Sequence, residues 1–125
     1  MTPERFNQIV DEVFDRCRSI LVDRAEMYAR GDRLSNFKRA AEFANTDEVF
    51  VLEGMAVKHE VSIHDYIDDL ANGVLHTREE WLEKMADTIN YLGPLLLALL
   101  EDEKRLEVGY LNVRPTVVPY YKERG

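Results

Sequence analysis

The chain has 125 residues, of which 46% are hydrophobic, and this is enough for one globular domain with a buried core. Its 24 acidic and 16 basic side chains give a net charge of -8, which excludes a broad basic surface of the kind that binds the phosphates of duplex nucleic acid. The single cysteine, Cys17, excludes an internal disulfide.

Two further sequence features indicate a cytoplasmic protein without a membrane partner. The start "MTPERFNQIV" lacks the charged and then hydrophobic pattern of a signal peptide. The longest hydrophobic run, "LGPLLLALL" from Leu92, is far shorter than the roughly 20 residues that a membrane span needs. We therefore expect this run to form a buried or interfacial helix.

The first predicted helix begins at the amino terminus. Thr2 suits the cap, Pro3 the first helical position and Glu4 the first turn, where the helix end is positive. Hydrophobic residues then recur at helical spacing at Phe6, Ile9, Val10, Val13, Cys17, Ile20 and Leu21. The pattern fades near Tyr28, and Gly31 supplies a stop, so we expect one long helix with Cys17 in its core face.

A short helix and a long helix are predicted next. Ser35 or Asn36 can cap the short one, whose buried side would carry Phe37, Ala40, Ala41 and Ala44. Thr46 would start the long one, with Asp47 and Glu48 in its first turn and Asn72–Gly73 at its end. Its hydrophobic stripe consists of Val49, Leu52, Ala56, His59, Ile63, Tyr66 and Leu70.

The fourth helix has the clearest start, because Thr77 and Glu80 make a capping box. Its stripe consists of Trp81, Leu82, Met85, Ile89, Leu92 and Leu96. Pro94 removes one backbone hydrogen bond and crowds the preceding turn, so we expect a kink there and not a break.

The predicted fold class is therefore all-α: a bundle of three long helices and one short helix over residues 1–105. Residues 106–125 are rich in β-branched and aromatic residues and are cut by Pro115 and Pro119, which predicts an extended tail, either a short edge strand or an oligomerisation arm. The run Leu95–Leu100 is hydrophobic on nearly all sides, which predicts a homodimer or a homotetramer.

Polar residues that could carry chemistry follow one edge of the third helix. At about 100° per residue, His59 lies inside the hydrophobic stripe, while Lys58, Ser62 and Asp65 lie to one side of it. His59 has two interpretations: a core histidine with a hydrogen bond to a neighbour, or a side chain beside a ligand site. Lys58 and Asp65 taken alone would be a solvated margin.

A second candidate group lies on the fourth helix, where Glu83, Asp87 and Asn90 share the side opposite the main stripe. Such a side would face water in an isolated amphipathic helix, but here it continues into a hydrophobic stretch that another element or subunit must cover. Carboxylates four residues apart repel each other, and a cation relieves the repulsion. Their oxygens, with Asn90, suit Mg²⁺ or Mn²⁺.

The segment "GDRLSNF" adds Arg33 and Asn36 close to a helix start, where free amides and the helix dipole favour anions. These two residues are candidates for phosphate binding. Arg33 is equally well explained as an ion-pairing loop residue.

Three stretches together resemble a known family: "DRLSNFKRAA", "GMAVKHEVSIHD" and "WLEKMADTINYLGPLLLALLED". They are similar to the small helical bacteriophage proteins that carry the nucleotide modification associated domain, over roughly residues 25–103. More distantly, "EKMADTINYL" resembles the metal-binding helix of the MazG-like all-α nucleoside triphosphate pyrophosphatases. A phage origin would place the chain in the host cytosol.

The pyrophosphatase resemblance implies an acidic pair on each of two antiparallel helices, with Mg²⁺ activating water against a nucleoside triphosphate. Asp87 then takes the place of the aspartate of the second pair. Lys84 stands where the glutamate of that pair is expected, so Glu83 would substitute for it. The first pair is not matched by a glutamate-rich motif, because Asp65 and Asp69 are the acidic residues along that edge.

These residues predict a pocket in which Lys58, His59, Ser62 and Asp65 face Glu83, Asp87 and Asn90, with Lys58 and Arg33 compensating phosphate charge. The pocket would bind a nucleotide or modified nucleotide, with His59 or Asp65 orienting water if the chain is a pyrophosphohydrolase. A non-enzymatic phage protein that captures a nucleotide, or that supports a modification enzyme, is the first alternative. A helical oligomeric adaptor is the second.

Overall fold

The computed structural model describes residues 1–24 and 31–107, and this part of the chain is helical, without a strand. Its α-helices are α1 (Pro3–Arg18), α2 (Ser35–Ala44), α3 (Glu48–Ala71), α4 (Arg78–Asn90) and α5 (Leu96–Asp102). A π-helical turn follows α1 at Ser19–Arg24, and a second one at Tyr91–Leu95 joins α4 to α5. The predicted all-α fold is confirmed, with α4 and α5 together forming the third long helix.

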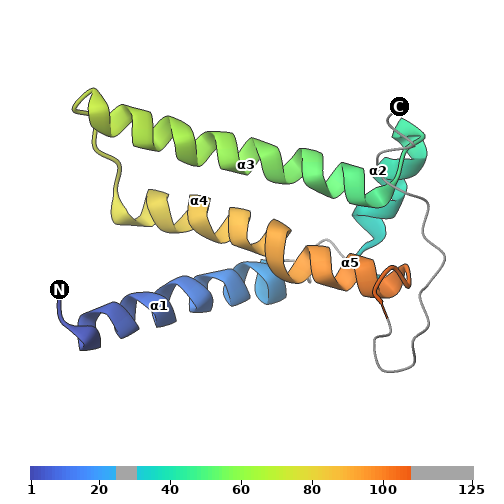
Figure 1. The fold of residues 1–125 in the computed structure, drawn as a ribbon, viewed down its shortest axis with the longest axis horizontal. Coiled ribbons are helices and arrows are strands. Elements are labelled where there is room, and N and C mark those ends of the chain that lie inside the picture. Colours follow the sequence, from blue (N-terminus) through green and yellow to red (C-terminus); the bar gives the residue numbers. More distant parts are fainter. Residues whose placement is uncertain (25–30, 108–125) are drawn as a thin grey trace.

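The helices form an open arrangement with α4 in the middle. In Figure 1, α3 and α4 run antiparallel as a hairpin, and α1 lies along the other side of α4. Helix α2 packs against α3 at the end of the hairpin where α5 also meets α3. Helix α4 therefore contacts both α1 and α3, and the side chains on its two opposite sides are covered by different helices.

The helix starts follow local capping chemistry. Thr2 Oγ1 accepts a hydrogen bond from the Arg5 amide at 3.1 Å, and Thr77 and Glu80 form the predicted reciprocal capping box. Helix α3 is capped by Asp47, whose Oδ1 accepts from the Val49 amide at 2.8 Å. It therefore begins slightly later than the predicted start at Thr46. Asn72 and Gly73 both suit left-handed backbone angles, but only Gly73 adopts one, with a φ of 76°, whereas Asn72 has a φ of -98°.

The predicted cap of α2 is wrong. Ser35 is already the first helical residue, and Leu34 occupies the cap position without a capping side chain. Asp32 replaces the cap, because its Oδ1 accepts a hydrogen bond from the Leu34 amide at 2.9 Å. Of the predicted buried positions on α2, Phe37 and Ala41 are buried, whereas Ala40 is half-buried and Ala44 is exposed.

Pro94 is accommodated without a break, as predicted. The chain stays helical from Arg78 to Asp102 because the turn that contains Pro94 is π-helical. A π turn contains one more residue than an α-helical turn. The wider turn makes room for the proline ring, and the helix continues although Pro94 donates no backbone hydrogen bond.

The main core lies where α2, α3 and α5 meet. Leu34, Phe37, Leu52 and Leu99 form its buried cluster, and Leu52 and Leu99 are 1% and 0% exposed. Tyr91, from the π turn, packs its ring edge-on against Phe37 with 6.2 Å between ring centroids. This core anchors one end of the hairpin, and aromatic and polar contacts at the other end are described below.

The hydrophobic stripes are covered unevenly. Cys17 is buried, as predicted, but Phe6 and Val10 of the same stripe are exposed, so their assignment to the core is wrong. The same correction applies to Leu70 of α3 and Leu92 of the π turn Tyr91–Leu95, which are 48% and 46% exposed. For the stripe of α1 the cause is clear. The physical reason is that α4 covers only one side of α1, while no described helix covers the remaining side.

Some sequence predictions fall outside the described residues. Residues 25–30 contain the predicted end of the first helix, and residues 108–125 contain most of the predicted extended tail. Among the described helices, none combines the length and the hydrophobicity that crossing a bilayer requires.

The core assignment predicts that Leu52→Ala lowers the free energy of unfolding by about 2–5 kcal/mol, because it removes a buried side chain and leaves a cavity. Urea denaturation followed by circular dichroism measures this change. Val57→Ala is the control on the same helix, since Val57 is 46% exposed, and it should change stability by less than about 0.5 kcal/mol. Equal effects of the two substitutions would contradict the position of the core.

Candidate functional site

The centre of the candidate site is the contact between His59 of α3 and Asp87 of α4. His59 Nδ1 lies 3.7 Å from Asp87 Oδ2, and each side chain is about 30% exposed, at 29% and 30%. The His59 ring also stacks on Tyr91, with centroids 5.0 Å apart and 23° between the planes. The imidazole is therefore oriented from two directions, and it faces the Asp87 carboxylate across the hairpin.

Asn90 lies one turn after Asp87 and is 2% exposed. Its Nδ2 donates a hydrogen bond to the Cys17 carbonyl of α1 at 3.1 Å, while its Oδ1 is buried and has no hydrogen-bond partner among the described residues. Burial raises the pKa of the Cys17 thiol, and the negative charge of Asp87 raises it further. Asp87 and Asn90 thus face a region that α1 covers, and we call this contact the α1–α4 seam.

Glu83 lies in the same seam, and Arg16, which was not among the predicted site residues, neutralises its negative charge. Arg16 of α1 donates to Glu83 at 3.0 Å and to both carboxylate oxygens of Glu79 at 2.6 and 2.9 Å. The hydrogen bond to Glu79 raises the pKa of Arg16. Glu83 was predicted to share a metal with Asp87, but here an arginine supplies the positive charge that we had assigned to a cation.

The remaining residues of the predicted pocket are arranged less closely. Ser62 is half-buried on α3, whereas Lys58 and Asp65 are exposed. At about 100° per residue, Asp65 lies about 120° around the helix from His59. Lys58 and Asp65 therefore flank the site and do not line its centre.

Arg33 and Asn36 belong to another part of the molecule. The Arg33 guanidinium donates a hydrogen bond to the Leu21 carbonyl, in the π turn that follows α1, and Asn36 is exposed on α2. Arg33 therefore ties the start of α2 to the end of the first helix. Phosphate binding by these two residues stays a prediction.

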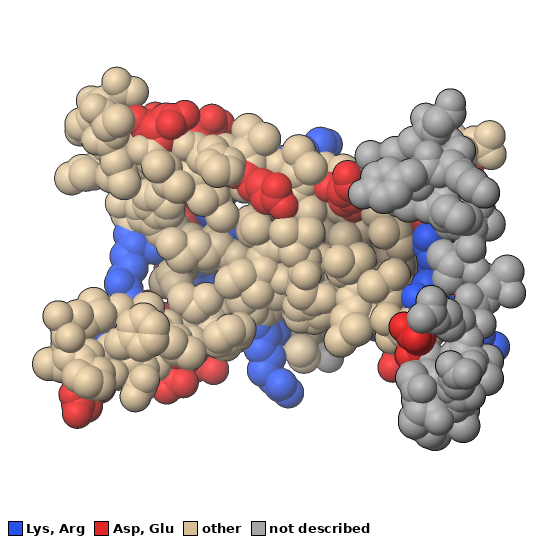
Figure 2. Space-filling view, viewed as in Figure 1, with Lys and Arg blue, Asp and Glu red and all other residues tan. Residues whose placement is uncertain are grey.

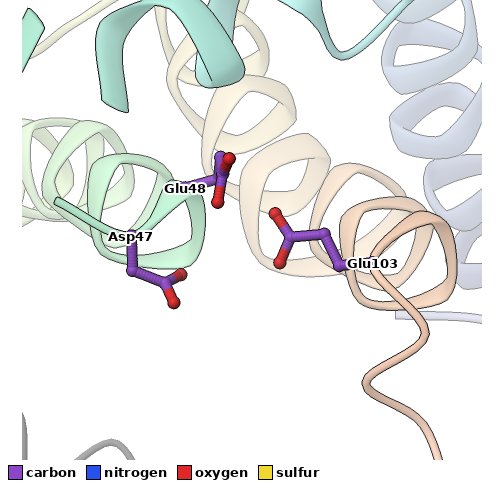
Figure 3. Close-up of side chains that lie close together, drawn as sticks. All are labelled: Asp47, Glu48 and Glu103. Carbon is purple, nitrogen blue, oxygen red and sulfur yellow. The ribbon is translucent and has the colours of Figure 1, made fainter. Parts of the chain in front are cut away.

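A second acidic cluster was also missed. Asp47, Glu48 and Glu103 each offer a carboxylate oxygen, and these oxygens lie within 4.8 Å of one another (Figure 3). Burial raises the pKa of Glu103, and the hydrogen bond with Glu48 raises it further. Arg105 donates to Asp47 at 2.8 and 2.9 Å and to Glu103 at 3.2 Å, so the cluster already contains one positive charge. We call the three acidic residues Asp47, Glu48 and Glu103 the Asp47 cluster.

The described surface includes two hollows that bear on the candidate site. The first, of about 530 Å³, lies at the corner between α2 and α3, and the second, of about 480 Å³, lies along α1. The first shares Asp47 and Glu48 with the Asp47 cluster, and the second includes Arg16. Neither hollow is lined by His59, Asp87 or Asn90, so the candidate site is a half-exposed contact between helices and not part of either hollow.

Comparison with known proteins finds no relative of this chain. No protein-family model matches the sequence, and no curated protein or solved structure is significantly similar to it. The function must therefore be argued from the site itself.

The Arg16 contact generates a prediction. Arg16→Gln removes the cation that bridges Glu79 and Glu83, so their mutual repulsion is restored and the melting temperature should fall. The same substitution should cost less in a Glu83→Gln background, because one of the repelling charges is then absent. A thermal double-mutant cycle measures the coupling. Arg18→Gln, at an exposed position of α1, is the control, and a cycle without coupling would contradict the assigned contact.

Proposed function

We propose that this chain binds a nucleotide or modified nucleotide through a divalent cation, Mg²⁺ or Mn²⁺, at the contact between α3 and α4. The observation that carries the proposal is the approach of His59 to Asp87. One turn further along α4, Asn90 adds a buried amide oxygen that has no hydrogen-bond partner among the described residues.

The donor atoms fit such a cation. Asp87 offers a carboxylate oxygen, His59 an imidazole nitrogen and Asn90 an amide oxygen, a set that suits Mn²⁺ especially well. The 3.7 Å between the His59 and Asp87 atoms is short enough for both to reach one ion after a small adjustment. Glu83 would join them only if Arg16 released it, since Arg16 holds it in the described arrangement.

The cation is needed because the chain is acidic. With a net charge of -8, the protein repels phosphate unless a cation or a local basic group intervenes. A bound divalent ion would neutralise phosphate oxygens, as it does in phosphoryl-transfer sites. Lys58 is exposed beside His59 and can contribute a further positive charge at the edge of the site.

Hydrolysis to release pyrophosphate is the step that the MazG-like resemblance would add. His59 is better placed than Asp65 to orient water, because it lies beside Asp87 and its second ring nitrogen, Nε2, stays available when Nδ1 binds the cation. Asp65 is exposed about 120° away around α3. Binding without turnover corresponds to a phage protein that captures a nucleotide or supports a modification enzyme. Hydrolysis and binding without turnover would use the same contact between α3 and α4, and one experiment that reads both stabilisation and product can distinguish them.

The proposal predicts that a nucleoside triphosphate with Mn²⁺ raises the melting temperature of the wild-type chain, because a ligand that binds only the folded state stabilises it by about 2.7 kcal/mol at 100 times its Kd. Asp87→Asn should abolish most of this shift. A panel of nucleotides, with and without Mn²⁺ or Mg²⁺, is read by thermal unfolding and by pyrophosphate release.

The matched control is His64→Gln, because His64 is exposed on the same helix as His59. It should leave the nucleotide-dependent shift unchanged, whereas His59→Gln should reduce it. A shift in Asp87→Asn as large as in the wild type would overturn the proposal. A wild-type protein without any shift or product would favour the oligomeric adaptor.

We also propose that the chain acts as a homodimer or homotetramer. Phe6, Val10 and Phe14 lie four residues apart along α1 and are 59%, 36% and 59% exposed. Leu97 of α5 is 60% exposed. Figure 2 shows one face of the molecule whose middle is mostly uncharged and whose charged side chains lie mainly near its edges. Exposed hydrophobic surface of this kind is typical of protein contacts.

If the chain forms an oligomer through this stripe, the Phe6→Lys and Phe14→Lys double variant should have a lower assembly mass in solution than the wild type. The oligomer would dissociate because two unpaired charges would be buried at each copy's contact. Light scattering at micromolar concentration measures the mass. Phe43→Lys is the control, since Phe43 is 90% exposed on α2, outside this stripe. A monomeric wild-type protein would contradict the proposal.

A further inference from the structure

His76 lies in the turn between α3 and α4 and takes no part in the proposed nucleotide site. Its side chain is only 18% exposed. The ring stacks almost parallel on Tyr66, with centroids 3.7 Å apart and 7° between the planes. Trp81 meets both rings edge-on, at 5.2 Å from Tyr66 and 6.5 Å from His76. A turn residue is thus held between aromatic side chains of both helices.

Both ring nitrogens of His76 face carboxylates. Nε2 lies 2.6 Å from Asp69 Oδ2, at the end of α3, and Nδ1 lies 3.3 Å from Glu80 Oε2, in the first turn of α4. A neutral imidazole has only one N–H, so its other nitrogen would direct a lone pair at a negatively charged oxygen. Only the imidazolium form can donate to both carboxylates.

Glu80 connects this contact to the start of α4. Its Oε1 accepts hydrogen bonds from the Thr77 amide at 3.2 Å and from the Thr77 hydroxyl at 3.0 Å, while Oε2 faces His76. The same carboxylate therefore caps the helix and binds the imidazolium. Loss of the proton on His76 weakens a contact that fastens the end of α3 to the capping box of α4.

We propose that His76 is a proton-operated clamp, which fastens the α3–α4 turn when its ring is charged and loosens the turn when its ring is neutral. The groups that face it from the two helices are Asp69 and Tyr66 of α3 and Glu80 of α4. Lys84 of α4 adds a positive charge 5.7 Å from the centre of the Tyr66 ring.

The pH window follows from the direction of each pKa shift. The hydrogen bond to Asp69 is the largest cause that raises the pKa of His76, and Glu80 raises it further. The stabilisation by His76 is therefore complete below its unfolded pKa of about 6.5 and is lost as the pH rises through the higher folded value. Hydrogen bonds from Thr77 lower the pKa of Glu80, so its stabilisation is lost only as the pH falls through that lowered value.

The clamp is tested by two NMR measurements on the full chain. The ring of His76 should titrate above the ordinary histidine value of about 6.5. Amide hydrogen exchange, corrected for the intrinsic effect of pH, should show that the Val74 and Glu80 amides lose protection as the pH rises through the same midpoint. These amides report on the turn because they donate to the Asp69 carbonyl and to the Thr77 hydroxyl.

Three variants make the test specific. Asp69→Asn should lower the titration midpoint of His76, His76→Gln should remove the pH dependence of protection in the turn, and His64→Gln should leave both unchanged. A His76 that titrates at or below the ordinary value would overturn the proposal. Protection of Val74 and Glu80 that stays constant across the titration of His76 would overturn it as well.

Discussion

The packing of α1 on α4 depends on how the partly buried polar side of α4 is paired. A helix normally turns such a side to water, because an unpaired buried charge costs several kcal/mol. Here α1 supplies the partners: Arg16 binds Glu79 and Glu83, and the Cys17 carbonyl accepts a hydrogen bond from Asn90. These contacts join α1 to α4 along the seam that Asp87 borders.

This constraint explains why a histidine stands in the hydrophobic stripe of α3. A leucine at this position would bury well, but it would place a hydrophobic side chain against the Asp87 carboxylate. The His59 ring satisfies both neighbours, because its face stacks on Tyr91 while its edge points at the carboxylate. The π turn carries Tyr91 to this position, so the irregularity at Pro94 and the geometry of the site have a common origin.

The sequence predicted features that depend on near neighbours. The capping box at Thr77, the cap at Thr2 and the continuation of the helix through Pro94 are all governed by residues within one or two turns. Helical periodicity placed His59 in the stripe of α3 but put Asp87 on the side of α4 opposite its main stripe, so periodicity alone did not predict their contact. The cap of α2 was missed because Asp32, before the helix, competes with the expected Ser35.

Features that depend on distant residues could not be predicted in this way. Arg16 stands beside the hydrophobic stripe of α1, a position typical of a solvated arginine, and only the packing of α1 on α4 identifies its partners. The Asp47 cluster likewise requires Glu103, which the return of α5 brings to the start of α3. Phe6 was placed in the core because a stripe indicates which side is hydrophobic, but not how much of it a neighbour covers.

The proposed binding of a divalent cation at Asp87 and His59 is tested most directly with Mn²⁺, because Mn²⁺ broadens the NMR signals of nearby nuclei. The account predicts broadening centred on the His59 ring and the Asp87 amide of the full chain, and its loss in Asp87→Asn. Broadening centred on Asp47, Glu48 and Glu103, or unchanged spectra at millimolar Mn²⁺, would contradict it.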